Sequence, residues 1–327
     1  MKRHLQMRRE IWPLAAPFRI AGHLWEDLHT VIATITANGV TGSGEAAGVF
    51  YAGETADTIL AEIETVKDAI ESGASRLDLL DLLPAGGARN ALDCAIWDFE
   101  AKSSGTSVAD LTGRSRQALT TVFTIGIKDE IEDMAAEARS KAGFPVLKLK
   151  LDSEVPVERV EAVRSARPDA TIIIDANQGF SLDLLRNVLP AFERLDVAMI
   201  EQPLPRGQDD ALDAFTSPIP LCADESFFDR SDLAYALERY QIFNIKLDKT
   251  GGLTEALHIS EELARRGRPT MVGNMIGTSL AMAPAFLIGQ SCKFVDLDGP
   301  LLLAKDRENG MVYHDSQISW PRHLFWG

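Results

Sequence analysis

The chain has 327 residues, 46% of them hydrophobic, which is enough to bury a large core and more than one simple domain usually holds. Its 33 basic and 48 acidic side chains leave a formal net charge of -15, which disfavours nucleic acid and anionic membrane surfaces as partners. No segment approaches the ~20 apolar residues that span a bilayer, the basic N-terminus lacks a signal-peptide core, and the cysteines, Cys94, Cys222 and Cys292, fit reduced core residues. These totals predict a cytoplasmic protein whose partner is a small molecule.

The first part of the chain predicts a small α+β unit. An Asn38-Gly39 pair, the strongest short hairpin signal, separates two strand-like segments, and two helix-like segments with an apolar stripe follow. The expected strands and helices cover residues 29–39, 41–48, 54–73 and 86–105. The unit is expected to end near residue 115.

Beyond residue 115, short apolar strands alternate with helix-length segments. The strands are expected over residues 120–127, 146–151, 171–176, 197–202, 220–225, 240–248, 269–275 and 293–299. One residue near each strand end, usually polar, recurs at intervals of 22 to 27 positions, the length of one strand-helix unit: Thr124, Lys150, Asp175, Glu201, Asp224, Lys246, Gly273 and Asp296. Eight such units predict a parallel (β/α) barrel, with an open doubly wound sheet as the weaker alternative. Barrel enzymes build their sites at these strand ends.

Three carboxylates are predicted to converge at one side of the barrel mouth, because Asp175, Glu201 and Asp224 end the third, fourth and fifth strands. Carboxylates so crowded repel one another unless a cation lies among them. Hard oxygen donors without imidazole or thiolate favour Mg²⁺ over zinc. The six histidines lie away from the strand ends, where satisfied or solvent-facing rings are expected: His4, His23, His29, His258, His314 and His323.

Two lysines of the segment "VLKLKLD", Lys148 and Lys150, share one face of a strand because side chains alternate with a period of two. Alone, such a pair is more often a solvated surface. Lys150 and Lys246, however, end the second and sixth strands, which lie opposite each other in an eight-stranded barrel, so two amines can act on opposite faces of one carbon. Lys148 and the metal would stabilise an enolate. The neighbouring cations Lys148 and Lys249, together with the metal and the enclosed site, should lower the pKa values of the two bases toward neutrality.

The eighth strand ends in "DLDGP", which places Asp296 and Asp298 on one face, across the cavity from the three carboxylates. A paired anion there would bind a cationic group at the far end of the substrate, although a loop start or a second metal site would use the same residues. A substrate with its carboxylate at the metal and an ammonium at the aspartates is an extended zwitterion. A dipeptide fits that description.

Seven segments, in this order and spacing, resemble motifs of the enolase superfamily, muconate-lactonising subgroup, and most closely its dipeptide epimerases, typified by L-Ala-D/L-Glu epimerase: "ARNALDCAIWD", "LKLKLD", "IIDANQ", "IEQPLP", "ADES", "NIKLDKTGGLTEAL" and "DLDGP". The resemblance covers nearly the whole chain. It implies a modified (β/α)8 TIM-type barrel over residues 116–304 and an α+β capping domain over residues 1–115, completed by about residues 305–327. Families like this usually form homo-oligomers.

The resemblance also implies a role for each site residue. One Mg²⁺ per subunit is expected on Asp175, Glu201 and Asp224. Lys150 and Lys246 are expected to be the two bases, a pairing of lysine with Mg²⁺ known from this superfamily. Substrate contacts are expected from Lys148 to the carboxylate, from Thr124 along the wall, and from Asp296 and Asp298 to the ammonium.

The capping loops depart from the resemblance. Ala-Glu epimerases are expected to offer an arginine from the first loop, which here reads "FRIAGHLWEDL". Arg19 could serve from a different position, but Trp25 and two acidic residues stand near the place of the expected positive group, so specificity could have moved to another dipeptide. The second loop, "GVFYAGE", is expected to close over the substrate with Phe50 and Tyr51, for which ordinary apolar packing is an equal alternative.

The expected activity is therefore inversion of the α-carbon of a dipeptide's C-terminal residue by two-base proton transfer, with L-Ala-D/L-Glu or a related dipeptide as substrate, in the metabolism of peptidoglycan peptides. A muconate cycloisomerase, an o-succinylbenzoate synthase or an N-acylamino acid racemase would share the metal and the lysines, but the first two take substrates without an amine for the aspartate pair. A non-catalytic metal-binding scaffold would not need the lysines. A mandelate-type racemase would need a histidine at strand seven, where the chain reads "MVGNMIGTS".

Overall fold

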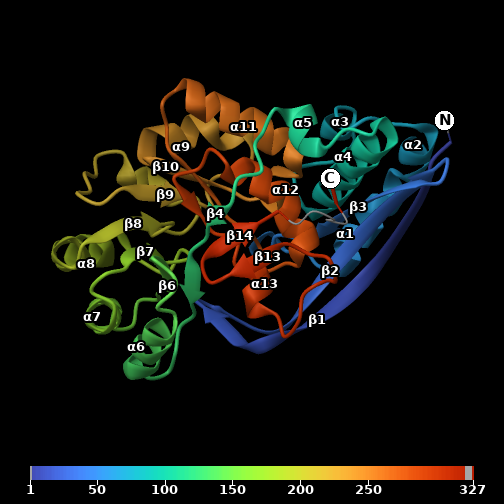
Figure 1. Ribbon diagram of the computed structural model, residues 1–327. Coiled ribbons are helices and arrows are strands. Elements are labelled where there is room, and N and C mark those ends of the chain that lie inside the picture. Colours follow the sequence, from blue (N-terminus) through green and yellow to red (C-terminus); the bar gives the residue numbers. More distant parts are fainter. Residues whose placement is uncertain (1, 321–325) are drawn as a thin grey trace.

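The computed structural model describes residues 2–320 and 326–327. A three-stranded antiparallel sheet with a layer of helices forms the N-terminal unit, and a barrel of parallel strands lies beside it (Figure 1). The N-terminal strands are β1 (His4–Ile20), β2 (His23–Ala37) and β3 (Val40–Ala46), in the sheet order β1-β2-β3. Asn38 and Gly39, at φ values of 50° and 78°, turn the chain between β2 and β3, so the predicted hairpin is confirmed.

Strand β1 was not among the predicted strands. It forms the edge of the sheet, and its register against β2 shifts between Pro13 and Phe18, so its burial lacks the strict alternation of an ordinary strand. An edge strand tolerates proline because one row of its backbone groups is unpaired. The β1-β2 hairpin matters for function because its end carries Phe18 and His23 into the wall of a cavity at the barrel mouth.

A layer of helices covers the N-terminal sheet. The helices are η1 (Phe50–Ala52), α1 (Ala56–Thr65), α2 (Lys67–Ser72), α3 (Leu79–Leu82), α4 (Gly87–Ser104) and α5 (Val108–Thr112). The single helix predicted over residues 54–73 is two helices, because Val66 leaves the helical conformation at φ -108° and ψ 5°. Helix α4 confirms the second prediction and lies so close to β3 that a Cβ on Gly42 or Gly44 would be 2.3 or 2.2 Å from its backbone. The glycines of β3 therefore allow sheet and helix to touch.

The barrel strands follow one another in sequence order, and all neighbouring pairs are parallel. They are β5 (Phe123–Ile125), β6 (Val146–Lys150), β7 (Thr171–Asp175), β8 (Val197–Glu201), β9 (Leu221–Ala223), β10 (Ile242–Ile245), β11 (Thr270–Val272) and β12 (Phe294–Val295). A hydrogen bond of 2.9 Å from Val122 N to Val295 O joins the first strand to the last. The barrel prediction is thus confirmed, and the doubly wound alternative is wrong.

Helices surround the barrel strands. They are α6 (Ile131–Ser140), α7 (Pro156–Ala166), α8 (Leu182–Arg194), η2 (Asp209–Leu212), η3 (Arg230–Asp232), α9 (Leu233–Arg239), α10 (Leu247–Thr250), α11 (Leu253–Arg265), α12 (Ser279–Gly289) and α13 (Gly299–Leu302). An apolar cluster fills the barrel interior: Val122, Ile173, Met199, Cys222, Ile242, Met271 and Phe294. Because side chains alternate along a strand, polar residues two positions after cluster members point inward as well, above the cluster.

The C-terminal segment returns to the N-terminal unit. Strands β13 (Val312–His314) and β14 (Gln317–Ser319) form a small sheet with β4 (Leu119–Thr120), whose last residue is the first of the segment predicted as the first barrel strand. Trp326 Nε1 then donates to Cys94 O of α4 at 3.2 Å. His323 lies outside the described residues. Within the described part of the chain, no helix is both long and apolar enough to cross a membrane.

Candidate active site

Three strand ends bring the predicted carboxylates together. Asp175 and Glu201 are the last residues of β7 and β8, and Asp224 directly follows β9. Each stands two positions after a residue of the interior cluster, so its side chain points into the barrel mouth. All three are fully buried, and one oxygen of each lies within 4.8 Å of the others. The prediction that these residues converge is confirmed.

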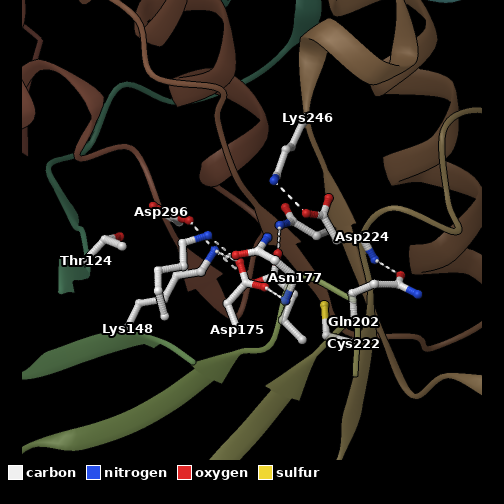
Figure 2. A network of polar contacts seen from close by, with 12 residues as sticks. Thr124, Lys148, Asp175, Asn177, Gln202, Cys222, Asp224, Lys246 and Asp296 are labelled. Carbon is white, nitrogen blue, oxygen red and sulfur yellow. Dashed lines mark hydrogen bonds and ion pairs between the residues drawn. The ribbon is translucent and has the colours of Figure 1, made fainter. Parts of the chain in front are cut away.

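The two lysines of β6 reach the same carboxylates. Lys148 Nζ lies 3.1 Å from Asp175 Oδ2 and 2.8 Å from Glu201 Oε2. It also lies 2.7 Å from Asp296 Oδ2 of the strand-eight segment, so one ammonium joins both acidic groups (Figure 2). Lys150 Nζ lies 2.6 Å from Asp175 Oδ2. Both lysines are buried, so the alternative of a solvated lysine face on this strand is wrong.

Lys246 reaches the carboxylates from another side of the barrel (Figure 2). It follows β10, and its Nζ lies 2.6 Å from Asp224 Oδ2. Lys249 Nζ contacts the other oxygen, Asp224 Oδ1, at 2.5 Å and also donates to Asn244 O at 3.0 Å. Asn244 Nδ2 in turn donates to Glu201 Oε1 at 2.6 Å, which fixes the orientation of that carboxylate.

Burial and charge shift the pKa values of these groups in different directions. Burial raises the pKa of Asp175, but the two β6 lysines outweigh it and bring the pKa to about 2. Burial and the charge of Asp175 raise the pKa of Glu201 to about 7. Burial lowers the pKa of Lys246, but Asp224 and Glu201 outweigh it, so this pKa lies above its ordinary value. Direct contact with the Asp224 carboxylate is the cause, whereas the predicted lowering depends on a metal at that carboxylate as well as on cationic neighbours.

The aspartate pair after β12 is divided between two partners. Asp298 Oδ2 accepts a hydrogen bond of 2.7 Å from Thr124 N of β5. Asp296 pairs with Lys148, which lies between it and the carboxylate group of β7 and β8. Both aspartates are buried, and burial together with the charge of Asp296 raises the pKa of Asp298 to about 7. Asp296 and Asp298 therefore lie at the site, and the side chain of Lys148 separates them from the carboxylates of β7 and β8.

A cavity of about 360 Å³ opens between the barrel mouth and the N-terminal unit. Lys150, Lys246 and Asn177 line it from the barrel side. Trp25 and Tyr51 line it from the capping loops. The two predicted bases therefore face a common space that the capping loops cover.

The capping loops place Arg19 and His23 in different surroundings. Arg19 does not line the cavity: its Nη1 pairs with Asp129 Oδ1 at 2.5 Å on the surface. His23 lines it, with its ring centroid 4.1 Å from that of Trp25 and 4.8 Å from that of Phe50; it is exposed and lies away from the barrel strand ends, as expected, but the capping hairpin carries it to the cavity. The spacing of the barrel strands could not indicate His23, because His23 lies in the β1-β2 hairpin, far from those strands in the sequence.

Several supporting residues have no signal in strand spacing alone. Asn177 lines the cavity, donates to Glu225 Oε1 at 3.2 Å and has a buried Oδ1 without a hydrogen-bond partner in the described chain. Gln202 Oε1 accepts from Asp224 N at 3.0 Å and so fixes the turn after β9. Both follow a carboxylate within two positions, in "DANQ" and "EQP", and that adjacency is the signal that could have found them.

The donor set fits a divalent cation. Three carboxylates supply hard oxygen ligands, and one oxygen of each lies within 4.8 Å of the others. Carboxylates buried so close together repel one another unless cations neutralise them, and the Lys148 ammonium contacts only part of this group, with Glu201 Oε2 at 2.8 Å. Asp175, Glu201 and Asp224 could therefore hold a metal ion together.

Comparison with known families decides the family. Residues 2–113 match the model of the mandelate racemase/muconate lactonizing enzyme N-terminal domain, and residues 130–322 match that of the enolase C-terminal domain-like family. The chain belongs to the enolase superfamily. This superfamily member is 40% identical to L-Ala-D/L-Glu epimerase of Escherichia coli over 97% of the chain and 99% of that protein. It is 44% identical to N-acetyl-D-glutamate racemase of a Pseudoalteromonas species over 76% and 79%.

Solved structures of superfamily members are similar over nearly their whole length. An Agrobacterium tumefaciens enolase family member with homology to dipeptide epimerases, with sodium and L-Ala-L-Glu bound, superposes with a TM-score of 0.97 at 44% identity, over 99% of this chain and 100% of that one. A dipeptide epimerase of Cytophaga hutchinsonii, complexed with Mg and D-Ala-L-Val, gives 0.91 at 28% identity, over 98% and 94%.

Proposed function

We propose that this protein is a Mg²⁺-dependent dipeptide epimerase that inverts the α-carbon of the C-terminal residue, acting on L-Ala-D/L-Glu or a related dipeptide. One observation carries the proposal: Lys150 and Lys246 come from the second and sixth barrel strands, line one cavity, and each contact a carboxylate of the same buried group. The similarity to dipeptide epimerases over nearly the whole chain supports it.

In the proposed reaction the α-carbon of the substrate lies between Lys150 and Lys246. The Nζ of one lysine takes the α-proton, and the Nζ of the other delivers a proton to the opposite face, so the configuration inverts. A base must be a free amine. Asp175 and Asp224, which pair with these lysines, are also proposed cation ligands, and ligation would withdraw their negative charge from the amines.

Asp175, Glu201 and Asp224 would hold one Mg²⁺ per subunit. A bound divalent cation supplies stabilisation for negative charge that develops on the substrate carboxylate. Lys148 lies within 3.1 Å of two of these carboxylates, so its ammonium can donate to a substrate carboxylate placed there. The protein's own contribution at this end is thus a fixed donor in a buried, water-poor setting.

The other end of the dipeptide would lie at the aspartate pair. An ammonium there would lie beside both carboxyl groups and would favour the ionised form of Asp298, which Thr124 N keeps in place. The side chain of the C-terminal residue would face the capping loops, where Trp25 and Tyr51 line the cavity. Arg19, held by an ion pair on the surface, has no part in this arrangement.

We further propose that residues 1–115 act as the capping domain, residues 116–304 as the catalytic barrel, and residues 305–327 as a completion of the cap. Hydrogen bonds from Trp326 and Gly327 to helix α4 support the last assignment. A homo-oligomeric state, a cytoplasmic location and a role with peptidoglycan peptides belong to the same proposal.

The test is incubation of the purified protein with Mg²⁺ in deuterated water and a matched substrate set. The set contains L-Ala-L-Glu, L-Ala-L-Leu and L-Ala-L-Phe, and N-acetyl-L-glutamate as the analogue without an ammonium. The expected result is deuterium at the α-carbon of the C-terminal residue and formation of the second epimer in the dipeptides. A double variant, Lys150→Met with Lys246→Met, is the control for lysine-dependent exchange.

Two results would overturn the proposal. Exchange confined to N-acetyl-L-glutamate would assign an N-acylamino acid racemase instead. No exchange in any compound, with tight Mg²⁺ binding, would leave a metal-binding scaffold.

A further inference from the structure

A barrel carboxylate holds the second capping loop. Asp248 Oδ1 accepts hydrogen bonds from Ala47 N at 3.0 Å and from Gly48 N at 2.8 Å, although these residues lie about 200 positions apart in the sequence. Asp248 is buried in helix α10, which begins directly after Lys246. The contact therefore joins the loop over the cavity to the segment that carries a proposed base.

A second carboxylate continues the same arrangement inside the N-terminal unit. Glu54 Oε2 accepts from Val49 N at 2.6 Å, and Glu54 Oε1 accepts from Gly87 N at the start of α4 at 2.9 Å. Three consecutive backbone N–H groups of the loop, those of residues 47–49, are thus held by two carboxylates, one from each part of the molecule. Hydrogen bonds to a charged acceptor are the stronger kind.

The loop is shaped for these bonds. Gly48 has a φ of +81°, which L side chains rarely adopt, and a Cβ there would lie 2.7 Å from Ile59 Cδ1. Burial raises the pKa of Asp248 to about 6, and the donors Gly48 N, the Asn90 side chain and Ala47 N lower it. Three donors therefore compensate the burial of the Asp248 carboxylate, and two of them belong to the loop that it holds.

The residues directly after this anchored backbone reach the site. Phe50 and Tyr51 come next in the chain, and both line the cavity. The ring of Phe50 contacts that of Trp25 with centroids 4.9 Å apart. The Tyr51 hydroxyl is buried without a hydrogen-bond partner in the described chain, and burial together with the charge of Asp224 raises its pKa. Movement of residues 47–49 would therefore move two residues of the wall that faces the proposed bases across the cavity.

We propose that Asp248 is a positioning residue that couples closure of the loop at residues 47–54 to the placement of Lys246. Its carboxylate binds the loop over the cavity to helix α10, which directly follows Lys246. The distance between that loop and Lys246, which enclose the substrate from two sides, is thereby fixed. The catalytic part of this inference rests on the proposed epimerase function; the loop anchor itself does not.

The experiment compares Asp248→Ala with Asp248→Asn, because asparagine keeps an oxygen that can accept both N–H bonds. Amide hydrogen exchange by mass spectrometry reads out the loop without any substrate. In Asp248→Ala, exchange of peptides covering residues 47–54 should accelerate about 10- to 100-fold, as expected for loss of hydrogen bonds to a charged acceptor, with the barrel strands unchanged. Asp248→Asn should stay within about threefold of the wild type.

Two further variants keep the test decisive. Gly48→Ala disturbs the loop from its other side and should reproduce the local acceleration if Asp248→Ala does not fold. Asp93→Ala is the matched control, because Asp93 also joins the two parts of the molecule by accepting from Thr254 N at 3.0 Å, but it does not contact the loop. It should leave exchange over residues 47–54 unchanged.

Kinetics then separate positioning from general stability. With the active dipeptide, Asp248→Ala should raise KM and lower kcat, about 10- to 100-fold in kcat/KM, and Asp248→Asn should restore most of it. Equal exchange over residues 47–54 in Asp248→Ala and wild type would overturn the anchor. An Asn variant as impaired as the Ala variant would overturn the role of the acceptor oxygen. If the wild type epimerises no dipeptide, the proposed function fails while the exchange result still decides the anchor.

Discussion

Replacing Lys148 with methionine should destabilise the protein in a way that Mg²⁺ partly reverses. Lys148 is 1% exposed, and its Nζ lies within 3.1 Å of carboxylates of Asp175, Glu201 and Asp296. Removing one partner from a buried ion pair leaves uncompensated charge and costs about 3–5 kcal/mol. The free energy of unfolding without added Mg²⁺ should therefore fall by about that amount in Lys148→Met.

Magnesium should recover part of this loss. A ligand that binds only the folded state adds about 2.7 kcal/mol at 100 times its Kd. In the wild type the ion must share its oxygens with the Lys148 ammonium, whereas in Lys148→Met the same carboxylates lack that partner. We therefore expect a larger stabilisation by Mg²⁺ in the variant than in the wild type.

The assay is urea unfolding followed by circular dichroism, with EDTA and over a series of Mg²⁺ concentrations. The control is Lys67→Met, which removes a lysine at the surface whose Nζ lies 3.6 Å from Oε1 of the exposed Glu64. Such a surface pair should cost at most about 1 kcal/mol and should not respond to Mg²⁺. Equal stability of Lys148→Met and wild type in EDTA, or an equal gain from Mg²⁺ in both, would refute competition between ammonium and metal.

The site and its surroundings support four further predictions. Lys150→Ala and Lys246→Ala should each abolish two-way epimerisation while one of them still exchanges deuterium into a single epimer by NMR; normal epimerisation by both would contradict the two-base assignment. Asp296→Asn should raise KM for dipeptides at unchanged Mg²⁺ affinity by calorimetry, and a large loss of affinity would speak against its role. Trp25→Arg should raise kcat/KM for L-Ala-L-Glu relative to L-Ala-L-Leu by about tenfold or more, and an unchanged ratio would remove Trp25 from specificity. Burial raises the pKa of Asp93 from 3.8 to about 6, so its contribution to the free energy of unfolding is fully present below pH 3.8 and is lost as the pH rises through about 6. Relative to Asp93→Asn, the wild type should lose on the order of 3 kcal/mol over that interval in urea unfolding, and parallel pH profiles of the two proteins would contradict this.

Local sequence patterns predicted most of the barrel strands and the charged residues at their ends. The two-residue period of a strand decides which side chains point inward, and Asp175, Glu201 and Lys150 each end a short strand, an apolar run in two cases and an alternating one in the third. Equal spacing of the units then places these ends in a ring. The break of the predicted helix at Val66 was missed because the buried apolar stripe continues across it, and the edge strand β1 was missed because its pattern is irregular.

By itself, the sequence determined the barrel, the three carboxylates and the two opposed lysines, because each depends on a repeat that neighbouring residues already express. Only the tertiary structure decided that Lys148 joins Asp296 to the carboxylate group, that His23 rather than Arg19 enters the cavity wall, and that Asp248 holds Gly48. These contacts join segments that are about 150 to 200 residues apart, or depend on how far one hairpin reaches. Contacts between segments so far apart in the sequence depend on how the folded elements pack against one another, and no local sequence pattern predicts them.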